Sequence, residues 1–214
     1  MNETAPTTKP LLRGHFHQAA FFFALGACFM LVAKSSNQRT LVAALVYSIS
    51  LTTLFGVSAL YHRRQWSESM RMWMRRLDHS SIFILIAGTC TPICRLAFPE
   101  AAGLQMLKLV WSATAGGVIL SLFWVHAPKW VSGLACVAVG WLAIPYLPEF
   151  RASLSPFNIA LIFIGGIFYT VGAVVYAVKR PNPSPRVFGY HEIFHLLVVI
   201  AAAFHFVVIN QLIK

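Results

Sequence analysis

Seven long apolar stretches dominate this chain and restrict it to a small set of folds. They lie at about 16–33, 41–61, 80–98, 107–124, 130–147, 157–178 and 192–213. Each is close to the roughly 20 residues that a helix needs to cross the hydrocarbon core of a bilayer. Hydrophobic residues make up 58% of the 214 residues and charged residues only 11%, which is far more apolar than an ordinary soluble domain. The sequence therefore predicts an integral membrane protein.

The apolar stretches are predicted to be helices. A backbone in lipid must satisfy its hydrogen bonds internally, so only helices and closed barrels cross membranes. The stretches lack the ten-residue alternation of barrel strands. We therefore predict an all-α bundle of seven transmembrane helices. Residues 1–15 form a polar cytoplasmic N-terminal segment, and residues 16–214 form the seven-helix domain, with no second domain.

The distribution of Lys and Arg predicts the orientation. With the N-terminus inside, the cytoplasmic segments hold eleven of the 17 basic residues: Lys9, Arg13, Arg63, Arg64, Arg71, Arg75, Arg76, Lys129, Lys179, Arg180 and Arg186. The other side holds the remaining six: Lys34, Arg39, Arg95, Lys108, Arg151 and Lys214. Because cytoplasmic loops carry the excess of positive charge, the N-terminus is predicted to be cytoplasmic and the C-terminus outside.

The net charge of +11 does not indicate nucleic-acid binding. The basic residues lie in short connections between spans, and no nucleic-acid-binding motif accompanies them. Anionic headgroups are the expected counter-charge, so membrane lipids are the expected partners.

In the connection between the second and third spans, apolar and basic residues alternate at helical spacing, so that a helix here would have an apolar face and a basic face. The apolar face holds Met70, Trp73, Met74 and Leu77, and the other face holds Arg71, Arg75 and Arg76. This pattern is typical of a short amphipathic helix on a membrane surface. We expect such a helix on the inner leaflet, leading to Asp78 at the start of the third span.

His191 and His195 open the last apolar stretch and predict a metal site. Residues four apart on a helix share one face and lie about 6 Å apart along its axis, which suits two ligands of one ion. An alternative is that both rings merely solvate the end of a membrane helix. We expect that simpler arrangement for His15 and His17, where the polar N-terminus meets the first span.

The predicted topology brings further ligand-type residues to the same depth. His62 ends the second span, and Asp78 begins the third, so both lie at the inner edge beside His191 and His195. Asp78 could alternatively pair with the neighbouring arginines. His205 lies ten residues, or about 15 Å, beyond His195, so we expect it to make a packing contact or an interhelical hydrogen bond.

Three motifs carry a resemblance to a known family. They are Ser58-x-x-x-His62, the segment Arg76-Leu77-Asp78-His79-Ser80 with Ala87-Gly88-Thr89-Cys90-Thr91-Pro92, and His191-x-x-x-His195 followed by Ala-Ala-Ala-Phe-His205-Phe. In this order they resemble the hemolysin III family, the bacterial branch of the progestin and adipoQ receptor family, which includes the adiponectin receptors. The first motif of the family is matched only loosely, by Arg13-Gly14-His15-Phe16-His17.

The resemblance implies a zinc site. Zn²⁺ would be bound by His62, His191 and His195 near the cytoplasmic face of the bacterial inner membrane. Asp78 would hold the water molecule on the zinc, and Ser58 would lie just behind the site. These two residues are the candidate catalytic residues.

The resemblance to adiponectin receptors, and more distantly to alkaline ceramidases, implies zinc-dependent hydrolysis of a lipid amide or ester. The expected substrate is a ceramide-like or fatty acyl lipid, and the role would be the regulation of membrane lipid composition. Three alternatives stay open: a receptor or sensor with structural zinc, a cytolytic or pore-forming protein, and an intramembrane protease. The last follows from His191-Glu192-x-x-His195, which matches the zinc protease motif with Glu192 as general base.

Overall fold

The structure, a computed structural model, describes residues 9–214, and the elements within this range are helices. They are α1 (His15–Ala33), α2 (Gln38–Arg63), α3 (Glu68–Leu96), α4 (Glu100–Phe123), α5 (Lys129–Trp141), the 3-10 turn η1 (Ile144–Tyr146), α6 (Leu147–Ser153), α7 (Pro156–Val178) and α8 (Tyr190–Leu212). With Lys129–Ser153 taken as one span, seven helical segments are long and apolar enough to cross a membrane. The predicted all-α seven-helix membrane fold is confirmed.

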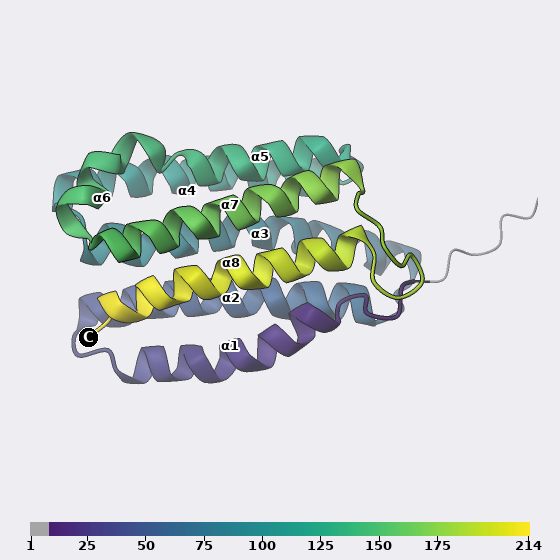
Figure 1. The fold of residues 1–214 in the computed structure, drawn as a ribbon, viewed down its shortest axis with the longest axis horizontal. Helices are drawn as coiled ribbons and strands as arrows, with labels where there is room; N and C mark the ends of the chain where they lie inside the picture. Colours follow the sequence, from purple (N-terminus) through teal and green to yellow (C-terminus); the bar gives the residue numbers. More distant parts are fainter. Residues whose placement is uncertain (1–8) are drawn as a thin grey trace, which may run out of the picture.

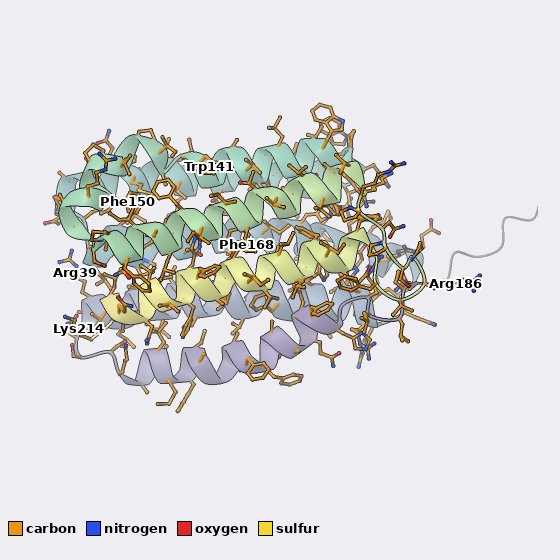
Figure 2. The ribbon with its side chains drawn as sticks, in the orientation of Figure 1. Arg39, Trp141, Phe150, Phe168, Arg186 and Lys214 are labelled. Carbon is orange, nitrogen blue, oxygen red and sulfur yellow. The ribbon has the colours of Figure 1, made fainter. Side chains whose placement is uncertain are left out.

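The helices lie lengthwise in one bundle, as Figure 1 shows. Helix α3 is central and packs against α2, α4, α5 and α8, while α1 contacts both α2 and α8 and so closes the ring. The end at which α1, α3, α5 and α8 begin is called the N-terminal end of the bundle. Figure 2 labels Arg186 at this end, and Arg39 and Lys214 at the opposite one.

Polar residues just before three of the spans fix where the helices begin. The Asn37 side chain accepts a hydrogen bond from the Thr40 amide at 3.0 Å, and Ser155 accepts one from the Asn158 amide at 3.2 Å. Ser67 makes the same contact at the start of α3. Such caps satisfy backbone donors that the first turn of a helix leaves free. The short sequences between spans therefore define the helix starts locally.

The predicted surface helix between the second and third spans is wrong. Helix α3 instead runs without interruption from Glu68 to Leu96. No Gly or Pro lies between Met70 and Ser80, so nothing ends the helix before the span begins. The two-faced segment forms the first turns of α3, with Met74 buried against the bundle and Trp73 exposed.

The fifth span, predicted as one segment at 130–147, is broken in the structure. Helix α5 ends at Trp141, and the chain continues through η1 into α6. Pro145 and Pro148 explain the break, because proline has no N–H for the helical hydrogen bond and clashes with the preceding turn.

Residues 9–14 form a strap across the N-terminal end of the bundle. The amides of Leu11 and Leu12 donate to the carbonyls of Arg186 and Val187, at 2.9 and 3.1 Å, in the connection between α7 and α8. Gly14 follows with φ of 82°, and a Cβ built on it would lie 2.8 Å from the Cβ of His62. Glycine is therefore required where the strap passes α2.

Two adjacent glycines on α4 provide a test of the packing. A Cβ on Gly117 would overlap the buried ring of Phe83 on α3, whereas a Cβ on Gly116 would meet no atom within 4 Å. Overpacking of this kind costs about 1–3 kcal/mol. We expect Gly117→Ala to lower the thermal midpoint in detergent, measured by circular dichroism. Gly116→Ala is the control, and it should leave the midpoint unchanged or raise it, because Ala favours helix over Gly by about 1 kcal/mol. Equal shifts in the two variants would contradict the α3–α4 packing.

Candidate metal centre

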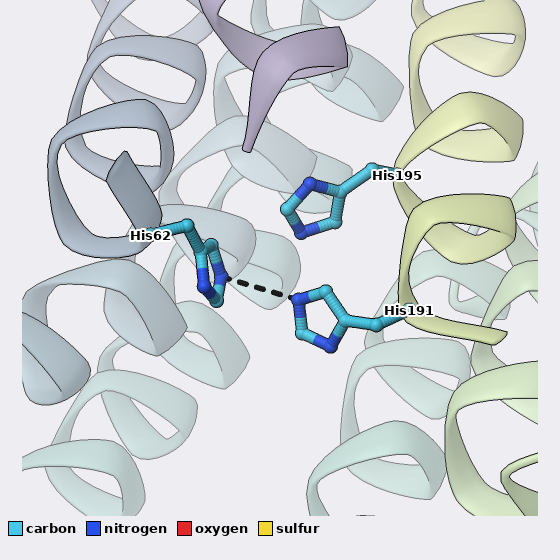
Figure 3. A group of neighbouring side chains, drawn as sticks. All are labelled: His62, His191 and His195. Carbon is cyan, nitrogen blue, oxygen red and sulfur yellow. Dashed lines mark hydrogen bonds between the residues drawn. The ribbon is translucent and has the colours of Figure 1, made fainter. Parts of the chain in front are cut away.

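Three buried histidines converge at the N-terminal end of the bundle (Figure 3). His62 comes from the last turn of α2, and His191 and His195 come from the first two turns of α8. One ring nitrogen of each lies within 4.8 Å of those of the other two. The Nε2 atoms of His62 and His191 are 3.2 Å apart. The three residues that the sequence predicted to meet are thus brought together.

In this histidine triad, the spacing of His62 and His191 is compatible with a tetrahedral zinc ion. Zn–N bonds of about 2.0–2.1 Å at tetrahedral angles place two ligand nitrogens about 3.3 Å apart, close to the observed 3.2 Å. The side chains are 9%, 8% and 2% exposed for His62, His191 and His195. Buried imidazoles need partners for their ring nitrogens, and one shared cation provides a partner for all three. Neutral imidazole is also a preferred ligand of zinc.

Asp78 and Ser58 lie beside the histidine triad. Asp78 Oδ2 is 3.7 Å from His62 Nε2, and among residues 9–214 no arginine lies within ion-pairing distance of this carboxylate. The carboxylate is thus closer to the triad than to the guanidinium groups of its own helix. Ser58 precedes His62 by one turn of α2, is buried, and lies next to the Asp78 carboxyl group. A carboxylate and a hydroxyl are therefore available at the edge of the triad.

Glu192 is occupied by structural contacts. Its Oε1 accepts a hydrogen bond from Arg13 of the strap, and its Oε2 accepts one from the Gly189 amide at 2.8 Å. The side chain is only 1% exposed. Because both carboxylate oxygens are engaged, Glu192 caps α8 and anchors the strap. This arrangement does not suit the general base of a protease, which needs an oxygen directed at the reacting water.

The expectation that His17 is solvated at the membrane edge is wrong. Its ring is 3% exposed and stacks on His195, with centroids 3.8 Å apart and an angle of 2° between the planes. Neither ring nitrogen has a hydrogen-bond partner among residues 9–214. Phe55 of α2 also packs against this ring, with ring centroids 5.2 Å apart, so a residue at a helix start is here enclosed by α2 and α8. His15 is less buried, and its Nδ1 lies 3.5 Å from Arg63.

His205 lies apart from the triad, as the sequence predicted. Its Nε2 is 3.1 Å from the carbonyl oxygen of Ile162 on α7. This is the expected interhelical hydrogen bond.

A cavity of about 1080 Å³ extends from the histidine triad into the bundle. One face of α3 follows it, with Arg75, Asp78, Ile82, Thr89 and Ile93 in turn, and deeper contacts come from Met106 and Phe150. The lining is therefore polar and charged beside the triad and mainly apolar further along.

Lys129 is a cavity residue that the sequence reasoning missed. Its Nζ donates to the Tyr190 hydroxyl at 2.7 Å and lies 4.5 Å from the centre of the Tyr176 ring. The sequence indicates Lys129 only as one of the basic residues that predict the orientation. The one available signal was the predicted topology, which puts this lysine at the same inner edge as His62.

Comparison with known proteins finds similarity to one family model and to several proteins. The sequence model described as "Haemolysin-III related" matches residues 6–206. "Hemolysin-3" of Bacillus cereus is 29% identical over 193 residues, which cover 89% of this chain and 85% of the relative. "Hemolysin-3 homolog" of Bacillus subtilis (strain 168) is 29% identical over 186 residues, covering 86% and 84%. "Monocyte to macrophage differentiation factor" of Homo sapiens is 24% identical over 169 residues, covering 77% and 68%.

The family match covers nearly the whole chain and includes all three members of the histidine triad. The similarity to the human protein supports the wider grouping that the motifs indicated. The chain belongs to the hemolysin III family, within the progestin and adipoQ receptor family.

Proposed function

We propose that this protein is a zinc-dependent hydrolase that cleaves an amide or ester bond of a membrane lipid. The observation that carries the proposal is the position of the histidine triad. Three buried imidazoles lie next to a carboxylate, at the polar end of a long cavity with mainly apolar walls. This combination provides a metal-binding site, a general base and an apolar cavity for an acyl chain.

In this proposal His62, His191 and His195 hold the zinc ion. Zinc with three protein ligands keeps one position open and acts as a Lewis acid that activates water. The second and third ligands are one helical turn apart on α8, and the first comes from α2. The ion therefore joins segments that are distant in the sequence but rigid locally.

Asp78 serves as the general base and Ser58 orients it. The carboxylate accepts a proton from water as the water oxygen bonds to the substrate carbonyl carbon. It returns the proton to the nitrogen or oxygen of the leaving group as the C–N or C–O bond breaks. Ser58 lies next to this carboxylate, so its hydroxyl can hold the group in one orientation.

The cavity walls indicate the substrate class. Apolar residues of α3, α4 and α6 line its deep part, and each buried methylene contributes about 0.8 kcal/mol. A fatty acyl chain can occupy this part while its carbonyl lies near Asp78. A ceramide-like or other acyl lipid fits this description. With the predicted orientation, the reaction takes place near the cytoplasmic face of the bacterial inner membrane.

The proposed site predicts the metal content of the protein. Purified wild-type protein should contain about one zinc per chain by elemental analysis, because three converging imidazoles match its coordination. Replacing His62, His191 or His195 singly with Ala should strongly reduce that content, since two ligands bind zinc much more weakly than three. A wild-type content near zero would refute the zinc site.

Two matched variants separate ligation from packing in the same measurement. His205→Ala removes a buried imidazole outside the triad and should retain zinc. His17→Phe keeps an aromatic ring against His195 and removes both nitrogens, so it should also retain zinc. Loss of zinc in His17→Phe would make His17 a ligand and contradict the three-histidine site.

A further prediction distinguishes Asp78 from Glu192 as the general base. In a hydrolysis assay with fluorescent ceramide and fluorescent phosphatidylglycerol, Asp78→Asn should retain zinc and lose about 10²–10⁴-fold in turnover. Glu192→Gln should lower the thermal midpoint, because it breaks a buried ion pair with Arg13, but its zinc-loaded fraction should retain turnover. Loss of turnover in Glu192→Gln but not in Asp78→Asn would make Glu192 the base and contradict this assignment. No cleavage by the wild type, with an unchanged membrane lipid profile, would favour a sensor with structural zinc.

A further inference from the structure

A group of cationic side chains lines the cavity at its polar end. It consists of Lys9, Arg13, Arg71, Arg75 and Lys129, which come from the strap, α3 and α5. We call it the cationic rim. The cavity lining also contains two carboxylates, Asp78 and Glu192. Glu192 is already paired with Arg13, and Asp78 lies 3.7 Å from His62. The rim therefore has more positive charge than the cavity itself neutralises.

Arg71 and Arg75 are the rim residues most available to a ligand. Among residues 9–214, no carboxylate lies within ion-pairing distance of either guanidinium group. Arg71 is exposed and Arg75 is half-buried. They are four residues apart, and Asp78 follows Arg75 by three, so all three share one face of α3. Along this face, Arg71 lies nearest to solvent, Arg75 follows, and Asp78 lies beside the triad.

The positive charge of the rim is distinct from the general excess of basic residues at this end of the bundle, because the rim residues line the cavity. Arg64, Lys179, Arg180 and Arg186 lie at the same end of the bundle but do not line the cavity. Arg71 and Arg75 do, next to the residues proposed to perform hydrolysis. Guanidinium groups bind carboxylate and phosphate with two parallel hydrogen bonds. The rim thus matches an anionic group on the molecule that enters the cavity.

We propose that the cationic rim selects acyl lipids whose headgroup is anionic, carrying a phosphate or a carboxylate. Arg71 and Arg75 bind the anionic group, and the acyl chain extends along α3 toward Met106 and Phe150. This inference rests on the proposed function, which places the acyl chain in the deep part of the cavity and the headgroup at the polar end. It adds the charge of the headgroup, which the histidine triad alone does not determine.

The test measures binding of four probes to purified zinc-loaded protein in nonionic detergent by isothermal titration calorimetry. The probes are dodecyl phosphate, laurate, dodecanol and inorganic phosphate. The two anionic amphiphiles should bind at least tenfold more tightly than dodecanol and inorganic phosphate. Binding of only one of them would still support the rim and would identify its preferred anion. Equal affinity for dodecanol, or full affinity for inorganic phosphate alone, would overturn the proposal.

Substitutions in the rim test whether the positive charge of Arg75 itself binds the anionic group. Arg75→Gln should weaken binding of dodecyl phosphate about tenfold and leave dodecanol unchanged, and Arg75→Lys should recover much of the loss. Arg64→Gln is the matched control, because it removes the same charge at the same end outside the cavity. Equal weakening by Arg64→Gln would show a general field effect and contradict a rim site.

Zinc content, thermal midpoint and turnover measured on the same samples keep the two proposals separate. Retained zinc and midpoint in Arg75→Gln would show that the variant is folded. Charge-selective binding without any turnover would refute the hydrolase and leave the rim intact. Turnover with no preference for anionic lipids would refute the rim and leave the hydrolase intact.

Discussion

Polar side chains face hydrocarbon only at a high energetic cost, and this cost decides which faces of the seven helices meet. On α1, Phe23 and Phe29 point outward while His17 is enclosed. On α8, His191, Glu192 and His195 are all buried within the bundle. Each of these polar groups would be unfavourable on the lipid-facing surface. Their burial therefore directs α1, α2 and α8 toward one another at the N-terminal end.

The strap completes this polar interior. Arg13 neutralises Glu192, and Gly14 lets the chain pass close to His62 before α1 begins. Arg13 of the strap also lines the cavity, so the strap forms part of the cavity wall beside the triad. Lowered dielectric strengthens charge interactions within such a site. The same polar interior would make the cationic rim and a bound metal ion effective on a substrate held in the cavity.

The sequence was informative where the bilayer restricts the chain most strongly. Spans of about 20 apolar residues allow few alternatives, so the seven helices and the common depth of His62, His191 and His195 followed from hydropathy and topology. The separate surface helix was a wrong prediction, because amphipathic periodicity identifies a helix but not its end. The burial of His17 depends on Phe55 of α2 and His195 of α8, contacts distant in sequence that no local pattern encodes. The role of Lys129 in the cavity was missed for the same reason.

The central claim is that the histidine triad binds zinc and leaves one coordination position open. X-ray absorption spectroscopy at the zinc edge of purified protein measures this coordination directly. The account predicts a four-coordinate site with three imidazole nitrogens at about 2.0–2.1 Å and one oxygen. A first shell containing sulfur, or one without three imidazole nitrogens, would contradict it.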